Sequence, residues 1–235
     1  MQGATRGDVK VLEAVDSIRY NSSRLTREYL LYLLYPNKKI LRALLEKRFQ
    51  SLETDMHEIA ISTKDPKTKG VLKYFAFEKV RIGEMLKKKP SLQNATALID
   101  LSESFMEGAS AIAKRHLYVP APEEEMWITT RSLDQDIEEI LKYYIAHHLI
   151  KDDPQLRHKL QNAAAKVKRA LIRINEYPYE GELKTTRAKL NHLWKTLEIY
   201  LAKADKLPLP IVTSLMGDEL EASINTLGIF HSKNQ

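Results

Sequence analysis

Two arginines and two serines near the start of the chain have the side chains that an anion site requires. They lie within residues 17–30, which read Ser-Ile-Arg-Tyr-Asn-Ser-Ser-Arg-Leu-Thr-Arg-Glu-Tyr-Leu. A guanidinium group presents a rigid fork of donors to a nitrate-like or carboxylate anion, and nearby hydroxyls add further donors. We therefore predict a ligand-binding site formed by Arg19, Ser22, Ser23 and Arg24.

The acidic residues around this stretch support an alternative interpretation. Asp16 lies three positions before Arg19, on the same face of a helix, where its carboxylate can pair with the guanidinium and repel an anion. Glu13 and Glu28 offer similar partners to the arginines near them. In this alternative the arginines pair with these carboxylates or reach solvent, and no anion binds.

Patterns that accompany catalysis, metals or cofactors are missing from the sequence. There is no GxSxG, GxxxxGKS/T, GxGxxG or HExxH pattern, and no cysteine to act as a nucleophile or zinc ligand. The adjacent His147 and His148 would point about 100° apart on a helix, which suits a shared metal poorly. The acidic run at 123–125 follows a proline, where carboxylates favour a helix N-terminus. We expect no enzyme activity, no cofactor and no metal site.

The net charge of +6 is concentrated in the first half of the chain. Residues 1–118 carry 21 Lys and Arg against 14 Asp and Glu, whereas residues 119–235 carry 16 against 17. A basic surface suits nucleic acid, an acidic partner or a small anion. No helix-turn-helix, zinc-finger or aromatic RNA-binding pattern is present, so we expect no nucleic-acid partner. The three lysines at 87–89 precede a proline and are predicted to form a solvated loop.

Prolines divide the chain into eight stretches, each with the apolar spacing of a helix. They lie at positions 36, 66, 90, 120, 122, 154, 178, 208 and 210. Proline starts or ends helices because it lacks an N–H and disfavours helix at the residue before it. Within a stretch, apolar residues recur in steps of four and three, the narrow seam of four-helix bundles. An example is Val11, Val15, Ile18, Ser22, Leu25, Tyr29 and Tyr32. We predict an all-α protein with about eight helices.

The two halves of the chain match each other at a nearly constant offset. At 115 positions, Phe105 falls on Leu220 and His116 falls on His231. Shared break positions favour an internal duplication, and two bundles that converged on one apolar pattern are the alternative. We predict two tandem antiparallel four-helix bundle modules, residues 1–118 and 124–235, joined by a linker at 119–123.

The first predicted helix resembles the opening helix of PilJ-type sensor domains, a family named for the type IV pilus chemoreceptor. The residues that carry this resemblance are Arg19, Ser22, Arg24, Leu25, Arg27, Tyr29 and Leu30. The second module matches the same pattern at Arg131, Leu133, Gln135 and Ile137. A tryptophan of the family's third helix is matched by Trp194, whereas the first module has Lys79 at that place. The helix is also similar to the ligand helix of nitrate-sensor kinases, in which the anion-binding role would fall on Arg19.

The resemblance implies the extracytoplasmic ligand- or partner-sensing region of a bacterial chemoreceptor or sensor kinase. Such a region lies in the periplasm as part of an inner-membrane protein, and it reaches the membrane through flanking helices absent from this chain. Its expected partners are a small anion, nitrate-like or carboxylate, or a pilus or periplasmic protein. It would form a weak homodimer through the first helix and signal by small shifts between packed helices.

A cytosolic helical protein–protein interaction module without a small ligand is the alternative function. It would hold a partner helix in a groove or along an apolar seam. Hydrophobic spans beside this region in the full-length protein would favour the sensor, and their absence would favour the interaction module.

Overall fold

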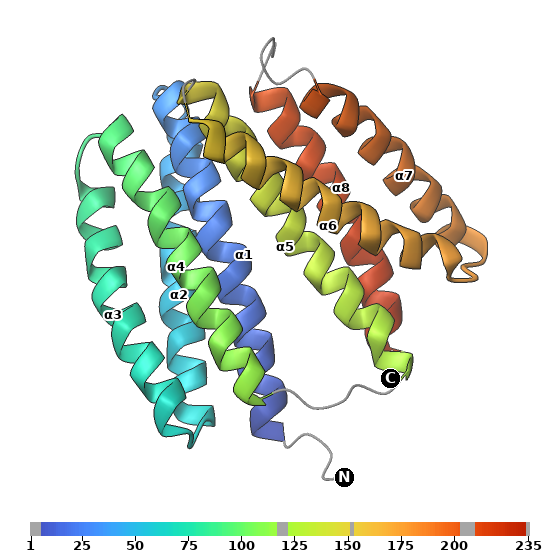
Figure 1. Cartoon of the computed structure of the whole chain (residues 1–235), viewed down its shortest axis with the longest axis horizontal. Coiled ribbons are helices and arrows are strands. Elements are labelled where there is room, and N and C mark those ends of the chain that lie inside the picture. The colour runs from blue at the N-terminus through green and yellow to red at the C-terminus, as the bar shows by residue number, and fades with distance from the viewer. Residues whose placement is uncertain (1–5, 117–121, 151–152, 203–209, 234–235) are drawn as a thin grey trace. The chain divides into compact units, whose positions relative to one another are not determined.

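The computed structural model describes residues 6–116, 122–150, 153–202 and 210–233, and Figure 1 shows that these residues form helices joined by short connections. The prediction of an all-α protein is confirmed, because the described residues contain eight α-helices and no strand. The helices are α1 Arg6–Leu34, α2 Lys39–Ser62, α3 Pro66–Lys87, α4 Leu92–His116, α5 Pro122–Leu149, α6 Pro154–Glu176, α7 Gly181–Ala202 and α8 Pro210–Lys233.

Four of the eight described helices begin at a proline, as the spacing of the prolines predicts. The first N–H groups of a helix have no partner within it, so the missing N–H of proline costs nothing there. Asp65 strengthens the start of α3, because its carboxylate accepts a hydrogen bond of 2.8 Å from the backbone N–H of Thr68. Asp153 caps α6 in the same way through Gln155, at 2.9 Å.

The chain divides into two compact units, Met1–Val119 and Pro120–Gln235. In the first unit α1 packs against α2 and α4, while α3 packs against α4 and more lightly against α2. In the second unit α5 packs against α6 and α8, while α7 packs against α8 and only slightly against α6. Successive helices of each unit run in opposite directions (Figure 1). Each unit is therefore an antiparallel four-helix bundle.

The bounds of corresponding helices agree with the predicted repeat. Their first residues are 116, 115, 115 and 118 positions apart for α1 and α5, α2 and α6, α3 and α7, and α4 and α8. The helix order and the neighbouring pairs are the same in both units. Of the predicted linker 119–123, residues 119–121 lie outside the described part, whereas 122 and 123 already belong to α5.

The predicted apolar seam of the first helix forms the centre of the first bundle. Its residues from Val11 to Tyr29 are buried, and Tyr32 at the end is partly exposed. The core also contains Phe75 of α3 and Phe105 of α4, whose rings stack with their centroids 4.7 Å apart. Among the described residues, no helix combines the length and apolar character that crossing a bilayer requires.

The close approach of α3 and α4 depends on Gly108. A Cβ at Gly108 would lie 2.5 Å from Cε1 of Phe75, which is fully buried and cannot move aside. Gly108→Ala should therefore lower the free energy of unfolding by about 1–2 kcal/mol, because overpacking outweighs the helix propensity that alanine adds.

Gly70 provides the matched control, because it lies in α3 and a Cβ there would meet nothing within 4 Å. Gly70→Ala should raise stability by about 0.5–1 kcal/mol. Urea denaturation followed by circular dichroism measures both changes. Equal stabilisation by the two substitutions would contradict this account of the α3–α4 contact.

Candidate functional site

The arginines of the predicted anion site have partners within the first unit. Arg19 donates a hydrogen bond of 2.9 Å to the hydroxyl of Ser110 on α4, and its guanidinium lies 3.6 Å from the carboxylate of Asp16. Arg24 donates through Nε to Glu28 at 3.0 Å and through Nη1 to the hydroxyl of Tyr20 at 2.6 Å. The pairs with Asp16 and Glu28 are ones that the alternative interpretation expects, whereas the contacts with Ser110 and Tyr20 were not predicted.

The hydroxyls of the two predicted serines do not converge with both arginines on one place where an anion could bind. The Ser22 hydroxyl is buried and donates to the backbone carbonyl of Arg19 at 3.1 Å. The Ser23 hydroxyl contacts the sulfur of Met106 on α4 at 3.5 Å. Arg19 and Ser23 thus both face α4, whereas Arg24 lies beside Glu28. An anion site on this helix stays a prediction, and an anion would have to compete with Asp16 for Arg19.

Arg24 belongs to a charge cluster that ties α1 to α2. The carboxylate of Glu28, with only 3% of its side chain exposed, lies between the guanidinium groups of Arg24 and Arg48, at 3.0 and 3.4 Å. A buried carboxylate needs such partners, because removing them would leave an uncompensated charge. The cluster therefore fixes the two helices rather than offering cations to a ligand.

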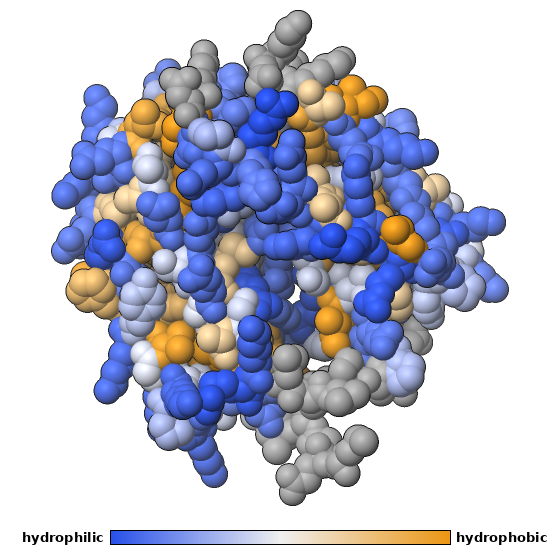
Figure 2. Space-filling view, in the orientation of Figure 1, coloured by the Kyte–Doolittle hydropathy of each residue, from blue (hydrophilic) through white to orange (hydrophobic). Residues whose placement is uncertain are grey.

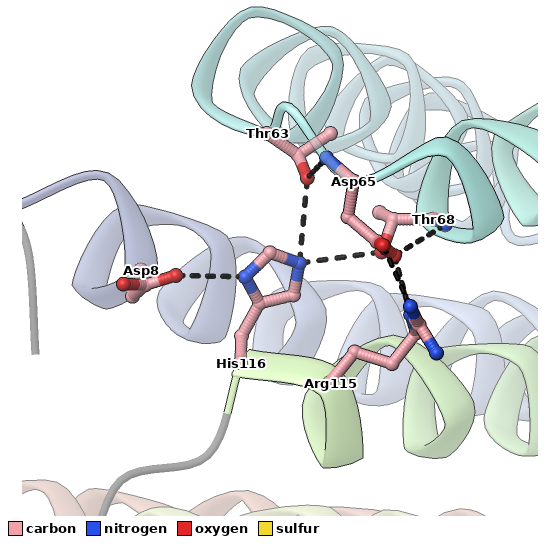
Figure 3. A network of polar contacts seen from close by, with 6 residues as sticks. All are labelled: Asp8, Thr63, Asp65, Thr68, Arg115 and His116. Atoms are coloured by element: carbon pink, nitrogen blue, oxygen red, sulfur yellow. Dashed lines mark hydrogen bonds and ion pairs between the residues drawn. The ribbon is translucent and has the colours of Figure 1, made fainter.

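A second polar network lies at the end of the first bundle where α2 joins α3 (Figure 3). Its centre is His116, the last residue of α4, with 8% of its side chain exposed. The Nδ1 atom of His116 lies 2.8 Å from the carboxylate of Asp8 on α1. Its Nε2 atom lies 3.2 Å from the Thr68 hydroxyl and 3.4 Å from the Thr63 hydroxyl. We call these residues, with Asp65 and Arg115, the bundle-end network.

Asp8, His116 and Thr68 lie in a row like the carboxylate, histidine and hydroxyl of a catalytic triad, in which Thr68 would be the nucleophile. Arg115 decides against that chemistry, because its hydrogen bonds hold the pKa of the Asp65 carboxyl well below its ordinary value. The ionised Asp65 only accepts, so the Thr68 hydroxyl, 2.8 Å away, donates its proton there. His116 Nε2 therefore faces an oxygen that can only accept from it. The arrangement joins three helices and does not activate Thr68.

The second unit has a histidine at the corresponding place, as the predicted offset of 115 positions expects. His231 near the end of α8 is buried, and its Nε2 atom lies 2.5 Å from the hydroxyl of Tyr179 in the α6–α7 connection. Rings of Tyr177, Tyr179 and Phe230 surround it, with centroids 4.7 to 5.5 Å from its own. Both histidines thus fasten the fourth helix of a unit to the junction between the second and third, one through threonine hydroxyls and the other through aromatic groups. His116 also contacts the carboxylate of Asp8 on the first helix.

A groove lies between α2 and α3 in the first unit, and we call it the α2–α3 groove. Its volume is about 790 Å³, within the range of small-molecule sites. Apolar and aromatic lining comes from Tyr29, Tyr32, Leu45, Phe49, Val80 and Leu86. Charged lining comes from Arg42, Glu46, Glu53, Lys79, Glu84, Lys87, Lys88 and Lys89. The groove lies toward the α3–α4 connection, while the bundle-end network fastens α2 to α3 at the other end.

The two units differ at a position that lines the groove in the first. Trp194 of α7 is buried in the second unit, with 4% of its surface exposed. The residue 115 positions earlier is Lys79, which lines the α2–α3 groove and pairs with Glu53 at 3.3 Å. The first unit thus has a flexible cation where the second has a bulky core residue. This difference was visible in the sequence, but the groove itself was not predicted.

Exposed apolar side chains alone do not mark a site on this surface. Figure 2 shows a mainly hydrophilic face with hydrophobic side chains scattered across it. Within the described part of the chain, no group of three or more His, Asp or Glu residues is placed to hold a metal ion. Among the grooves formed by described residues, the α2–α3 groove combines concavity, aromatic walls and charge and is the candidate site.

Comparisons with models of known protein families, with curated proteins and with solved structures gave no match.

The contact between His231 and Tyr179 predicts that acid weakens the second unit. Burial raises the pKa of Tyr179 to about 12, so its hydroxyl stays protonated, and Nε2 of a neutral His231 can accept a hydrogen bond from it. Burial also lowers the pKa of His231, so the stabilisation is present above the unfolded pKa of about 6.5 and is lost as the pH falls below it.

His231→Gln provides a side chain that accepts a hydrogen bond and does not titrate. The wild type should lose on the order of 1 kcal/mol more than this variant between pH 7.5 and pH 5.5, the value of one hydrogen bond. Thermal unfolding at a series of pH values measures the difference. Parallel pH profiles for the two proteins would show that His231 does not carry the effect.

Asp55 of α2 should change the stability of the protein with pH in the opposite direction to His231. Burial raises the pKa of its carboxyl to about 6, although a hydrogen bond from Ser17 on α1 opposes this shift. The folded state therefore holds the proton more tightly than the unfolded chain does, so stability falls as the pH rises from about 4 to about 6. Asp55→Asn should stabilise the protein at pH 7 by about 1–2 kcal/mol, allowing for partial solvent screening, and should have little effect at pH 4. Denaturation at both pH values checks this, and an equal effect at both would contradict it.

Proposed function

We propose that the chain is a non-catalytic, ligand- or partner-sensing helical region whose first unit receives the ligand in the α2–α3 groove. The groove has the volume, the aromatic walls and the few charged groups that are common in binding sites. The bundle-end network argues against nucleophilic chemistry at Thr68, since that hydroxyl donates to Asp65. The α2–α3 groove is the observation that carries the proposal.

The arrangement of α3 suggests how binding would be transmitted. At one end of α3, Asp65 caps the helix and is held by Arg115 of α4. Along its length α3 packs only lightly against α2. A ligand between α2 and α3 would therefore tilt α3 about its fastened end, and small shifts between packed helices are an established means of signalling.

The membrane chemoreceptor or sensor kinase that the resemblance implies is the setting we propose for this function. In that setting the region would lie in the periplasm and associate weakly into a homodimer. A helical interaction module would use the same groove for a segment of a partner protein. The two differ in what fills the groove, so the first experiment asks whether the groove binds at all.

The neutral aromatic dye N-phenyl-1-naphthylamine, which fluoresces in apolar surroundings, tests the groove. The wild type should bind it with a dissociation constant on the order of 1–100 µM. Gly83→Leu should weaken binding at least tenfold, because Gly83 lines the groove and a Cβ there would already lie 3.1 Å from the ring of Phe49.

Ala76→Leu is the matched control, because Ala76 is exposed on α3 and does not line the groove. It should bind the dye like the wild type, and circular dichroism should show that both variants are folded. Equal dye binding by Gly83→Leu and the wild type would place the binding elsewhere and overturn the proposal.

A further inference from the structure

One end of the α2–α3 groove combines hydrogen-bond donors and positive charge. Tyr29 lines the groove and is 1% exposed, and its hydroxyl accepts a hydrogen bond of 3.2 Å from the backbone N–H of Ser91. Among the described residues the hydroxyl makes no other hydrogen bond, so its own proton can be donated to a ligand. Ser91 directly follows the lysine run 87–89 and Pro90. Tyr29 and the three lysines at 87–89 therefore line the same end of the groove, next to the α3–α4 connection.

The carboxylates of the groove do not cancel this charge. Five Lys and Arg side chains and three Glu side chains line it. Glu53 pairs with Lys79 at 3.3 Å, and Glu46 lies 3.9 Å from Arg42 on the same helix. Among the described residues that line the groove, Glu84 is the only acidic side chain left to balance the three lysines at 87–89. The lysine end of the groove thus keeps a positive excess that favours an anionic group.

The rest of the groove is suited to an apolar body. Tyr32, Phe49, Leu45 and Leu86 line it, and aromatic side chains offer large contact areas to flat or acyl groups. A nitrate-sized ion would occupy only a small part of about 790 Å³ and would leave these walls without contacts. The walls and the charged end together suit a ligand that has an apolar part and an anionic part.

We infer that the α2–α3 groove binds an amphipathic organic anion, whose carboxylate, phosphate or sulfonate lies beside Tyr29 and Lys87–Lys89 and whose aromatic or acyl body contacts Phe49 and Tyr32. This inference rests on the proposed function and specifies its ligand class. The site differs from the predicted anion site on α1, since none of Arg19, Ser22, Ser23 and Arg24 lines the groove.

A partner helix fits the groove less well than a small molecule. An α-helix with its side chains is about 10 Å across. Its insertion would displace α3 from α2 much further than a small molecule would. The hydrogen bonds of Thr63 to His116 and of Asp65 to Arg115, at the fastened end of α3, oppose so large a displacement. A small molecule requires only a slight tilt of α3, so we take a small molecule as the occupant.

Two dyes with the same aromatic body test the ligand class. The anion 1-anilinonaphthalene-8-sulfonate carries a sulfonate that N-phenyl-1-naphthylamine lacks. The wild type should bind the sulfonate at least tenfold more tightly at low salt, and added salt should reduce the difference. Tyr29→Phe should weaken binding of the sulfonate about threefold to tenfold, and by a larger factor than it weakens binding of the neutral dye.

Two triple variants separate a local effect from net charge. K87Q/K88Q/K89Q removes the lysines at the groove and should weaken binding of the sulfonate at least tenfold. K64Q/K67Q/K69Q removes three exposed lysines around the start of α3, at the other end of the helix, and should have little effect. Equal losses in both variants would show a general charge effect and overturn the inference.

The remaining outcomes distinguish the two proposals. If the wild type binds both dyes equally well and Gly83→Leu binds neither, the groove is a binding site but the anionic ligand class is wrong. If the wild type binds neither dye, the proposed function fails and the ligand class fails with it. If an acidic helical peptide binds in the groove and the sulfonate dye does not, the occupant is a partner protein and the inference is overturned.

Discussion

Burial of the apolar seam of the first helix is the constraint on which each bundle depends. In the first unit α1 packs against both α2 and α4, and in the second α5 does the same with α6 and α8. Because hydrophobic stabilisation grows with the apolar area buried, these contacts contribute more to the stability of each unit than the light contacts of α3 and α7 with its second helix. The third helix is therefore the element that can move at least cost, and in the first unit it forms one wall of the groove.

Polar contacts decide where the third helix is fixed. The ionised Asp65 accepts hydrogen bonds from Thr68 and Arg115, and His116 adds contacts to Asp8 and the two threonines. At the other end of α3, the contact between Tyr29 and Ser91 leaves the phenolic proton available. One end of α3 is thus held by charge-assisted hydrogen bonds, which are the stronger kind, and the other end borders an open groove.

The two units show how one architecture can carry different chemistry. His116 and His231 occupy corresponding places, yet one faces a carboxylate and the other faces aromatic rings. Lys79 and Trp194 also correspond, and one lines a groove whereas the other fills a core. Each bundle keeps most of its apolar seam because packing requires it, yet single seam positions differ between the units, as Lys79 and Trp194 do. This difference between the units is why the proposed function rests on the first unit alone.

The sequence by itself determined the helical class, the eight helices and the offset between the two halves. The seam of α1 and the prolines at the starts of α3, α5, α6 and α8 act through neighbours in the chain, so spacing alone reveals them. The pairing of Arg19 with Asp16 and of Arg24 with Glu28 was also within reach, because those residues are three and four positions apart.

Tertiary structure decided which groups meet across the bundle. Ser110 reaches Arg19 from 91 positions away, and Asp8 reaches His116 from 108 positions away. The α2–α3 groove likewise depends on how far apart two helices stand, and no local pattern encodes that distance. Periodicity shows which face of a helix is buried, but the side chains on facing helices set the separation between them. For this reason the sequence predicts only a solvated loop at the lysines 87–89. Their place at the charged end of a groove depends on the folded chain.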